Sequence, residues 1–263
     1  MNIIVCVKQV PASSEVKVDP VTGVLVRNGI DSKMNPYDLF AVETALALKE
    51  SCGGTVTAIT MGPPAAKAVL MESIYMGADK GVLISDRRFA GADVLATSYT
   101  ISSAVKSLGE YDLIICGKQT TDGDTAQVGA EMAEFLKIPH YSNVSSVEIK
   151  GDEVHFVCAL GRTVLDANMK MPCLISTDGD VNTPRLPSYK RKKAAEGNDE
   201  LITVLSLDDF SDCNPDNYGL SGSPTQVEKI FPPEKNTEHV TVDGTSAEAA
   251  AAIFKVLCDK KFI

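Results

Sequence analysis

The chain has 263 residues, 44% of them hydrophobic and 23% charged, which is ordinary for a soluble globular protein. Its net charge of −10 argues against nucleic acid as a partner, because binding a phosphate backbone requires a basic surface. Seven scattered cysteines without a Cys-x-x-Cys spacing argue against zinc, iron–sulfur and disulfide sites and favour a reducing compartment.

An apolar strand opens the chain. It covers residues 2–7 and leaves no room for a signal peptide. No apolar stretch reaches the roughly 20 residues that span a bilayer. We therefore expect a cytoplasmic protein without membrane insertion.

Strands and helices then alternate up to about residue 140. Asn35 and Pro36 are typical of the N-cap and first position of a helix. The predicted strands are 2–7, 55–61, 81–84 and 112–116, and the predicted helices are 36–50, 64–76, 92–108 and one after residue 124. Such repeats predict a doubly wound, mainly parallel α/β sheet, whose ligands lie beyond the carboxyl ends of the strands.

The segment 112–135 is the most informative part of the chain. Its apolar strand ends at Gly117, and a polar loop with a second glycine leads into a helix for which Asp124 or Thr125 is a suitable N-cap. A polar loop at a helix N-terminus can bind an anion. An ordinary βα loop would have the same pattern, and neither a Walker loop nor a Gly-x-Gly-x-x-Gly sequence is present.

The pattern changes after residue 140. Residues 144–150 and 153–159 alternate like the strands of a hairpin, and 172–177 is predicted to be a last buried strand. We divide the chain into a nucleotide-binding domain (1–184), a loop or linker (185–200) and an extended arm with a terminal helix (201–263). The linker carries a basic run without acids, which by itself is most often a solvated surface: Arg185, Lys190, Arg191, Lys192 and Lys193.

Residues for acid–base, nucleophilic or metal chemistry are not apparent. The three histidines have no partner at catalytic or metal-ligand spacing, and no nucleophile elbow occurs. We predict no catalytic residues and no metal site, so binding is better supported than chemistry.

Five short segments in register resemble the beta subunit of an electron-transfer flavoprotein. They are residues 5–10 (VCVKQV), 34–37 (MNPY), 60–63 (TMGP), 76–79 (MGAD) and 117–127 (GKQTTDGDTAQ). The resemblance implies a flavodoxin-like domain, of the adenine-nucleotide alpha-hydrolase-like kind, and a C-terminal arm that wraps the alpha subunit of a heterodimer. It also implies that the loop at 185–197 recognises a partner.

Carried over position by position, the resemblance implies a nucleotide site on the loops that the sheet prediction brings to one edge. Its residues are Cys6, Asn35, Pro36, Tyr37, Asp38, Met61, Gly117, Lys118, Gln119, Thr120, Thr121, Asp122, Gly123, Asp124, Thr125, Ala126, Gln127 and Val128.

Two branches of the family differ in what this site holds. Residues 10–23 and 26–29 resemble the bifurcating branch, in which FAD accepts a hydride from NADH. One electron then goes to ferredoxin or flavodoxin, and the other passes through the alpha-subunit FAD to a flavin dehydrogenase for an acyl-CoA or a 2-hydroxy acid, a reaction of anaerobic metabolism. The plain branch holds structural AMP instead. A different class, an ATP-binding stress or signalling module, would not need the long arm.

Overall fold

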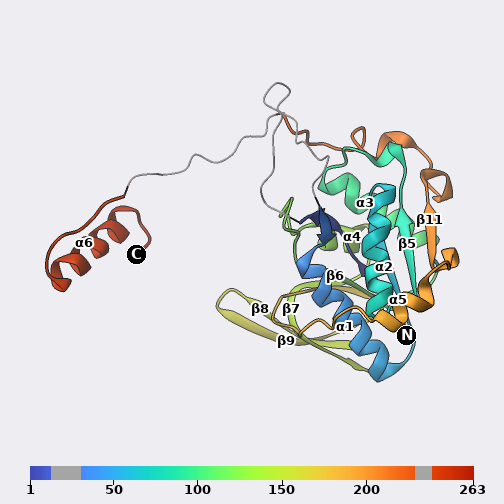
Figure 1. Ribbon diagram of the computed structural model, residues 1–263, viewed down its shortest axis with the longest axis horizontal. Coiled ribbons are helices and arrows are strands. Elements are labelled where there is room, and N and C mark those ends of the chain that lie inside the picture. The colour runs from blue at the N-terminus through green and yellow to red at the C-terminus, as the bar shows by residue number, and fades with distance from the viewer. Residues whose placement is uncertain (13–30, 229–238) are drawn as a thin grey trace. The chain divides into compact units, whose positions relative to one another are not determined.

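The computed structural model describes residues 1–12, 31–228 and 239–263, which belong to two compact units, Met1–Glu228 and Lys229–Ile263 (Figure 1). The strands of the larger unit are β1 (Asn2–Cys6), β2 (Gln9–Pro11), β3 (Ser32–Met34), β4 (Thr55–Met61), β5 (Lys80–Ile84), β6 (Leu113–Gly117), β7 (His140–Lys150), β8 (Glu153–Leu160), β9 (Thr163–Lys170), β10 (Cys173–Thr177) and β11 (Ile202–Leu205). Its α-helices are α1 (Pro36–Cys52), α2 (Lys67–Met76), α3 (Val94–Ser107), α4 (Val128–Leu136) and α5 (Tyr189–Ala195).

Within the described residues, nine strands form one sheet in the order β11-β5-β4-β1-β6-β10-β7-β8-β9. The strands from β11 to β7 run parallel, and β7, β8 and β9 pair antiparallel. The chain moves outward from β1 first through β4 and β5 and then, on the other side, through β6 and β10. This reversal confirms the predicted doubly wound fold and creates its switch point between β1 and β6.

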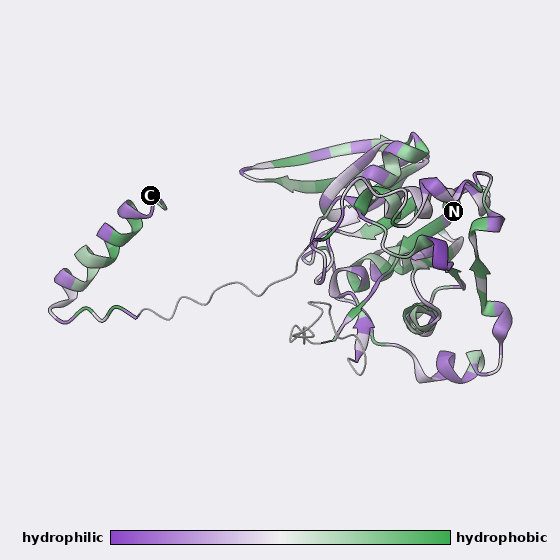
Figure 2. Ribbon diagram, turned by 90° about the horizontal axis from the view of Figure 1, so that it is seen from above, coloured by the Kyte–Doolittle hydropathy of each residue, from purple (hydrophilic) through white to green (hydrophobic). Residues whose placement is uncertain are grey.

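Alternate residues of the central strands enter two separate cores, because successive side chains point to opposite faces. Val5 and Ile115 pack in the core that includes residues of α1 and α2. Ile4 and Ile114 pack in the core that includes residues of α3 and α4. Helices thus cover both faces of the sheet, and the hydrophobic colour in Figure 2 is concentrated in its strands.

The hairpin prediction was incomplete. Two strands were expected, but β9 adds a third, and β8 and β9 project beyond the rest of the larger unit (Figures 1 and 2). Val154, Phe156 and Cys158 alternate on the buried side of β8. On β9 only Met169 is buried, so its weak alternation gave little signal.

Residues 185–228 lie in the larger unit together with residues 1–184, whereas the sequence predicted a linker and the beginning of an arm. The segment 189–195 forms α5, and β11 joins the sheet beside β5. Phe210 and Tyr218 are buried against Phe89 in the core beneath α3. These apolar anchors are too few and too widely spaced to produce a periodic pattern.

The smaller unit contains α6 (Ser246–Asp259). Thr245 is its N-cap, and the Thr245 and Glu248 side chains form a reciprocal capping box. None of the α6 side chains is buried, and Ile253, Phe254 and Val256 are each more than half exposed.

Candidate functional site

The candidate site lies at the carboxyl edge of the sheet, at the switch point between β1 and β6. The loops that follow β1, β4 and β6 leave the sheet at this edge, and α1 begins beside them. The predicted site residues are therefore drawn from segments that the topology brings to one place.

Asn35 connects these segments. Its side chain is fully buried, and its amide nitrogen donates to Asp38 Oδ1 and to the Gln119 carbonyl, each at 2.9 Å. Its amide oxygen accepts from the Thr121 N–H at 3.2 Å. The sequence correctly predicted that α1 begins after Asn35, but the side chain makes no capping bond, because it holds the loop after β6 instead.

Asp38 is a buried carboxyl group beneath this junction. It accepts from the Lys8 N–H at 2.7 Å as well as from Asn35. Burial raises its pKa from 3.8 to about 7, although the hydrogen bonds from Asn35 and Lys8 act in the opposite direction. Gly117 lies directly against Asp38, and a Cβ at that position would overlap the Asp38 carboxylate. A glycine is therefore required where β6 enters the loop.

The loop after Gly117 is held at its base and exposed beyond it. Lys118 donates through its N–H to the Thr177 carbonyl at 3.1 Å. Its ammonium is 3.1 Å from Asp178 and 5.9 Å from the centre of the Tyr37 ring. Residues 121–127 are all exposed. The loop thus presents its polar groups to a ligand from a fixed base.

The predicted N-cap of α4 was wrong. The helix begins at Val128 with Gln127 at the N-cap, instead of after Asp124 or Thr125. Asp124 and Ala126 have φ angles of 54° and 56°, which a right-handed helix does not allow. For alanine this conformation is costly, and such strain is concentrated at ligand sites. Turns of this kind orient N–H groups into concavities that bind anions.

Cys6 and Met61 provide apolar surface at the same edge. Cys6 and Cys116 lie at the ends of adjacent strands, and a hydrogen bond between their thiols, together with burial, raises the pKa of Cys6 well above its ordinary value. Cys6 is therefore suited to contact and not to nucleophilic attack. Met61 is partly buried against the core below α3.

Three residues of this edge were not included in the predicted site. Lys8 follows β1, Thr177 ends β10 and Asp178 follows it, and all three bond to predicted site residues. Their position after parallel strands was the signal that could have identified them.

The site fits an adenine nucleotide. It combines an exposed loop with left-handed turns, the N-terminus of α4 and apolar contacts at Cys6 and Met61. The first N–H groups of a helix have no intrahelical acceptor and favour negative charge. Phosphate and adenosine could both be bound there.

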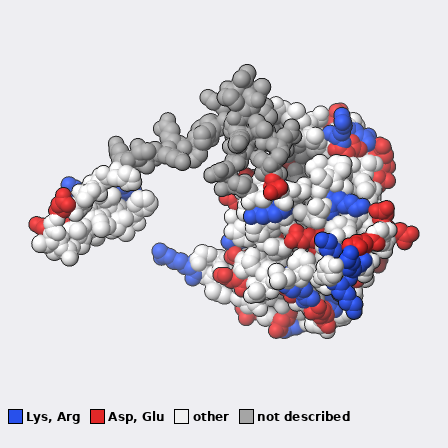
Figure 3. All heavy atoms as spheres, in the orientation of Figure 1, with Lys and Arg blue, Asp and Glu red and all other residues white. Residues whose placement is uncertain are grey.

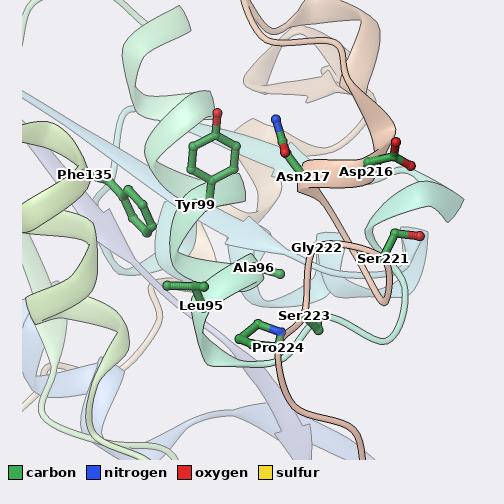
Figure 4. A pocket seen from close by; sticks show the side chains of 10 residues that line it. All are labelled: Leu95, Ala96, Tyr99, Phe135, Asp216, Asn217, Ser221, Gly222, Ser223 and Pro224. Carbon is green, nitrogen blue, oxygen red and sulfur yellow. The ribbon is translucent and has the colours of Figure 1, made fainter.

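A hollow of about 550 Å³ opens beside α3 (Figure 4). It is lined by Leu95, Ala96, Tyr99, Phe135, Asp216, Asn217, Ser221, Gly222, Ser223 and Pro224. Tyr99 and Phe135 meet edge to face with ring centres 5.2 Å apart. Among the described residues, no lysine or arginine lines this hollow, so these residues are poorly suited to a phosphate.

The residues of the predicted basic segment differ in their surroundings. Arg185 is held by α1: its guanidinium contacts Glu43 at 2.8 Å and Glu50 at 2.5 Å, and its N–H donates to Glu43. Residues 190–193 on α5 are exposed, as are Leu186 and Tyr189. In Figure 3 basic and acidic atoms gather over the surface where Figure 1 labels α5.

Among the described residues, no cluster of three or more histidine, cysteine or acidic side chains could hold a metal ion. None of the helices in the described part of the chain is long and apolar enough to cross a membrane.

Comparison with known proteins gives consistent matches. A family profile described as "Electron transfer flavoprotein domain" matches residues 22–206. The chain is 43% identical to "Electron transfer flavoprotein subunit beta" of Clostridium acetobutylicum over the full length of both chains. It is 39% identical to "Caffeyl-CoA reductase-Etf complex subunit CarD" of Acetobacterium woodii, also over the full length of both. It is 38% identical to "Protein FixA" of Azorhizobium caulinodans, with 95% of this chain and 91% of the relative aligned.

Proposed function

Because the chain belongs to the electron transfer flavoprotein family, as a beta subunit, we propose that its sheet edge binds FAD in a cytoplasmic, NADH-oxidising heterodimer. In this proposal the cofactor supplies hydride acceptance and one-electron transfer. One electron goes to ferredoxin or flavodoxin, and the other goes through the alpha-subunit FAD to a flavin dehydrogenase.

The observation that carries the proposal is the junction at Asn35. A single buried amide joins the start of α1 to the loop after β6, and Asp38 joins the same junction to Lys8. The residue that follows β1, the start of α1 and the loop after β6 are thereby held in fixed positions relative to one another. Preorganised polar groups bind a ligand without the cost of ordering them at the moment of binding.

Each part of the edge has a proposed role toward the nucleotide. Residues 117–128 hold the pyrophosphate, with help from the N-terminus of α4, and Cys6 and Met61 lie against the adenosine. The side chain of Asn35 keeps the phosphate loop in position. The dipole at a helix N-terminus stabilises an anion by about 0.3–1 kcal/mol, and by up to about 2 kcal/mol in a partly buried geometry.

The most specific part of the proposal is electron bifurcation. The sequence resemblance that supports it covers residues 10–23 and 26–29, and of these only residues 10–12 lie in the described part of the structure. The match to a relative named as part of a caffeyl-CoA reductase–Etf complex also supports a role beside a dehydrogenase. The absence of an apparent catalytic acid or base is compatible with hydride chemistry carried by cofactors.

We propose two contact surfaces for partners. The exposed apolar side chains of α6 would pack on the alpha subunit. Residues 190–193, together with exposed Leu186 and Tyr189, would dock on a dehydrogenase that offers an acidic rim and an apolar centre. Arg185 would act differently, because its charge is already neutralised by Glu43 and Glu50. It would fix the segment that leads to α5.

Anaerobic titration of the purified heterodimer with NADH tests the proposal. Bleaching of two flavin equivalents per heterodimer is expected. Bleaching of one equivalent, with AMP recovered from the denatured protein, would instead assign the chain to the plain electron-carrier branch. Recovery of neither nucleotide from the beta site would refute nucleotide binding itself.

A further inference from the structure

Lys8 and Asp122 form an ion pair above the site junction. The Lys8 ammonium is 2.7 Å from Asp122 Oδ1, and the same oxygen accepts from the Gly123 N–H at 2.8 Å. One carboxylate oxygen therefore collects an ammonium and a peptide N–H, the kinds of donor that bind a phosphate oxygen.

The base of Lys8 is fixed, while its end is accessible. Its N–H donates to Asp38 at 2.7 Å, and its carbonyl accepts from the Asn35 N–H at 2.9 Å. The Lys8 side chain is 44% exposed and that of Asp122 is 32% exposed. A fixed backbone with an exposed ammonium allows Lys8 to change partner without any change in the sheet.

The position of Asp122 conflicts with a direct contact between its carboxylate and a phosphate. Two anions that share one set of donors repel each other. Asp122 also belongs to the exposed loop that contains the left-handed residues Asp124 and Ala126, and not to a strand or helix. A rotation of the Asp122 side chain would free both the Gly123 N–H and the Lys8 ammonium for a phosphate.

We infer that Asp122 Oδ1 occupies the position of a phosphate oxygen of the bound nucleotide, and that Lys8 exchanges Asp122 for that phosphate on binding. This inference rests on the proposed nucleotide site and adds Lys8 to it as a ligand. It also changes the role of Asp122 from the one implied by the resemblance, because Asp122 becomes an internal competitor of the phosphate.

Binding of AMP and of adenosine to the nucleotide-free heterodimer tests the exchange, with Lys8→Gln, Lys8→Arg and Asp122→Asn as variants. Lys8→Gln should weaken AMP binding by roughly tenfold or more, since it removes a charge-assisted hydrogen bond. Lys8→Arg should restore most of the affinity. Asp122→Asn should strengthen AMP binding by about threefold or more, because it removes a competing charge. Adenosine binding should be unchanged in all three variants.

A matched control is Lys49→Gln, since Lys49 also forms an ion pair, with Asp79, but lies in the last turn of α1, whereas the site lies at the beginning of that helix. It should leave both affinities unchanged. Weaker AMP binding by Asp122→Asn, or unaltered AMP binding by Lys8→Gln, would overturn the exchange while the proposed nucleotide site stands. If the unmodified heterodimer bound neither ligand, the proposed function would fail and this inference with it.

Discussion

Asp38→Asn should change how the stability of the protein depends on pH. The pKa of Asp38 is about 7 in the folded chain against an ordinary value of 3.8, so the folded state holds a proton that the unfolded state releases. The contribution of Asp38 to the free energy of unfolding therefore falls as the pH rises from about 4 to 7. At about 1.4 kcal/mol per pH unit, this group removes roughly 4 kcal/mol over that window. Asparagine does not titrate, so the variant lacks this loss.

Urea unfolding of both proteins at intervals from pH 4.5 to 8 measures the difference. The stability of Asp38→Asn relative to the unmodified protein should increase steadily up to about pH 7 and then level off. Asp122→Asn is a control from the same site. Burial would raise the pKa of Asp122, but its hydrogen bonds to Lys8 and other donors lower it overall, so it is ionised in both states and its difference should stay flat above pH 5. A flat difference for Asp38→Asn would show that Asp38 is ionised in the folded protein and refute the reasoning.

Three further predictions concern the rest of the chain. Arg185→Met should lower the free energy of unfolding by about 2 kcal/mol, because it leaves Glu43 and Glu50 without their cation. Lys193→Met, which breaks an exposed ion pair, should lower it by less than about 0.5 kcal/mol. Equal losses for the two variants in urea unfolding would contradict this prediction. Truncation after residue 228 should change the free energy of unfolding of the larger unit by no more than about 0.5 kcal/mol. The truncated chain should no longer co-purify with the alpha subunit. A destabilised fragment would mean that the larger unit needs the smaller one to complete its core. Replacement of residues 190–193 by glutamine should slow electron transfer to the dehydrogenase and make the transfer rate less dependent on ionic strength, while NADH oxidation continues. If the dependence of the rate on ionic strength did not change, these charges would be only a solvated surface.

The central part of the fold could be predicted from the sequence because its signals are local. The runs that became β1, β4 and β6 are short and apolar, and α1 begins at Pro36 as expected. Parallel strands buried on both faces have a continuous apolar pattern that sequence alone reveals. The doubly wound, mainly parallel arrangement then followed from the alternation of strands and helices.

Tertiary contacts decided what the sequence did not predict. The strand β11 pairs with β5 more than a hundred residues earlier, and Tyr218 is buried by packing with Phe89 and Phe210. The helix α4 begins later than the sequence predicted, because two residues of the preceding loop adopt left-handed conformations. Neither effect has a local periodic signature, so propensity gave the wrong answer at these positions.

In the candidate site, too, local features could be predicted from the sequence and contacts between distant segments could not. Its segments were predicted because each follows a strand or begins a helix, but their connections were not. The double role of Asn35, the raised pKa of Asp38 and the engagement of Arg185 with α1 depend on contacts between distant segments. For Asn35, the sequence predicted a cap, whereas the structure uses its side chain as a link.

The central claim is that this edge of the sheet holds an adenine nucleotide on the loop after β6, and the nucleotide content of a loop variant tests it most directly. Thr125 is exposed within that loop, between two left-handed residues, and Thr125→Glu places a like charge where the phosphate is proposed to bind. Thr163→Glu adds the same charge at an exposed position of β9 and is the control. Nucleotide released from each denatured heterodimer is quantified by chromatography. Loss of the beta-site nucleotide from a folded Thr125→Glu protein, with full retention in Thr163→Glu, is the predicted result. Full retention in both would contradict the account.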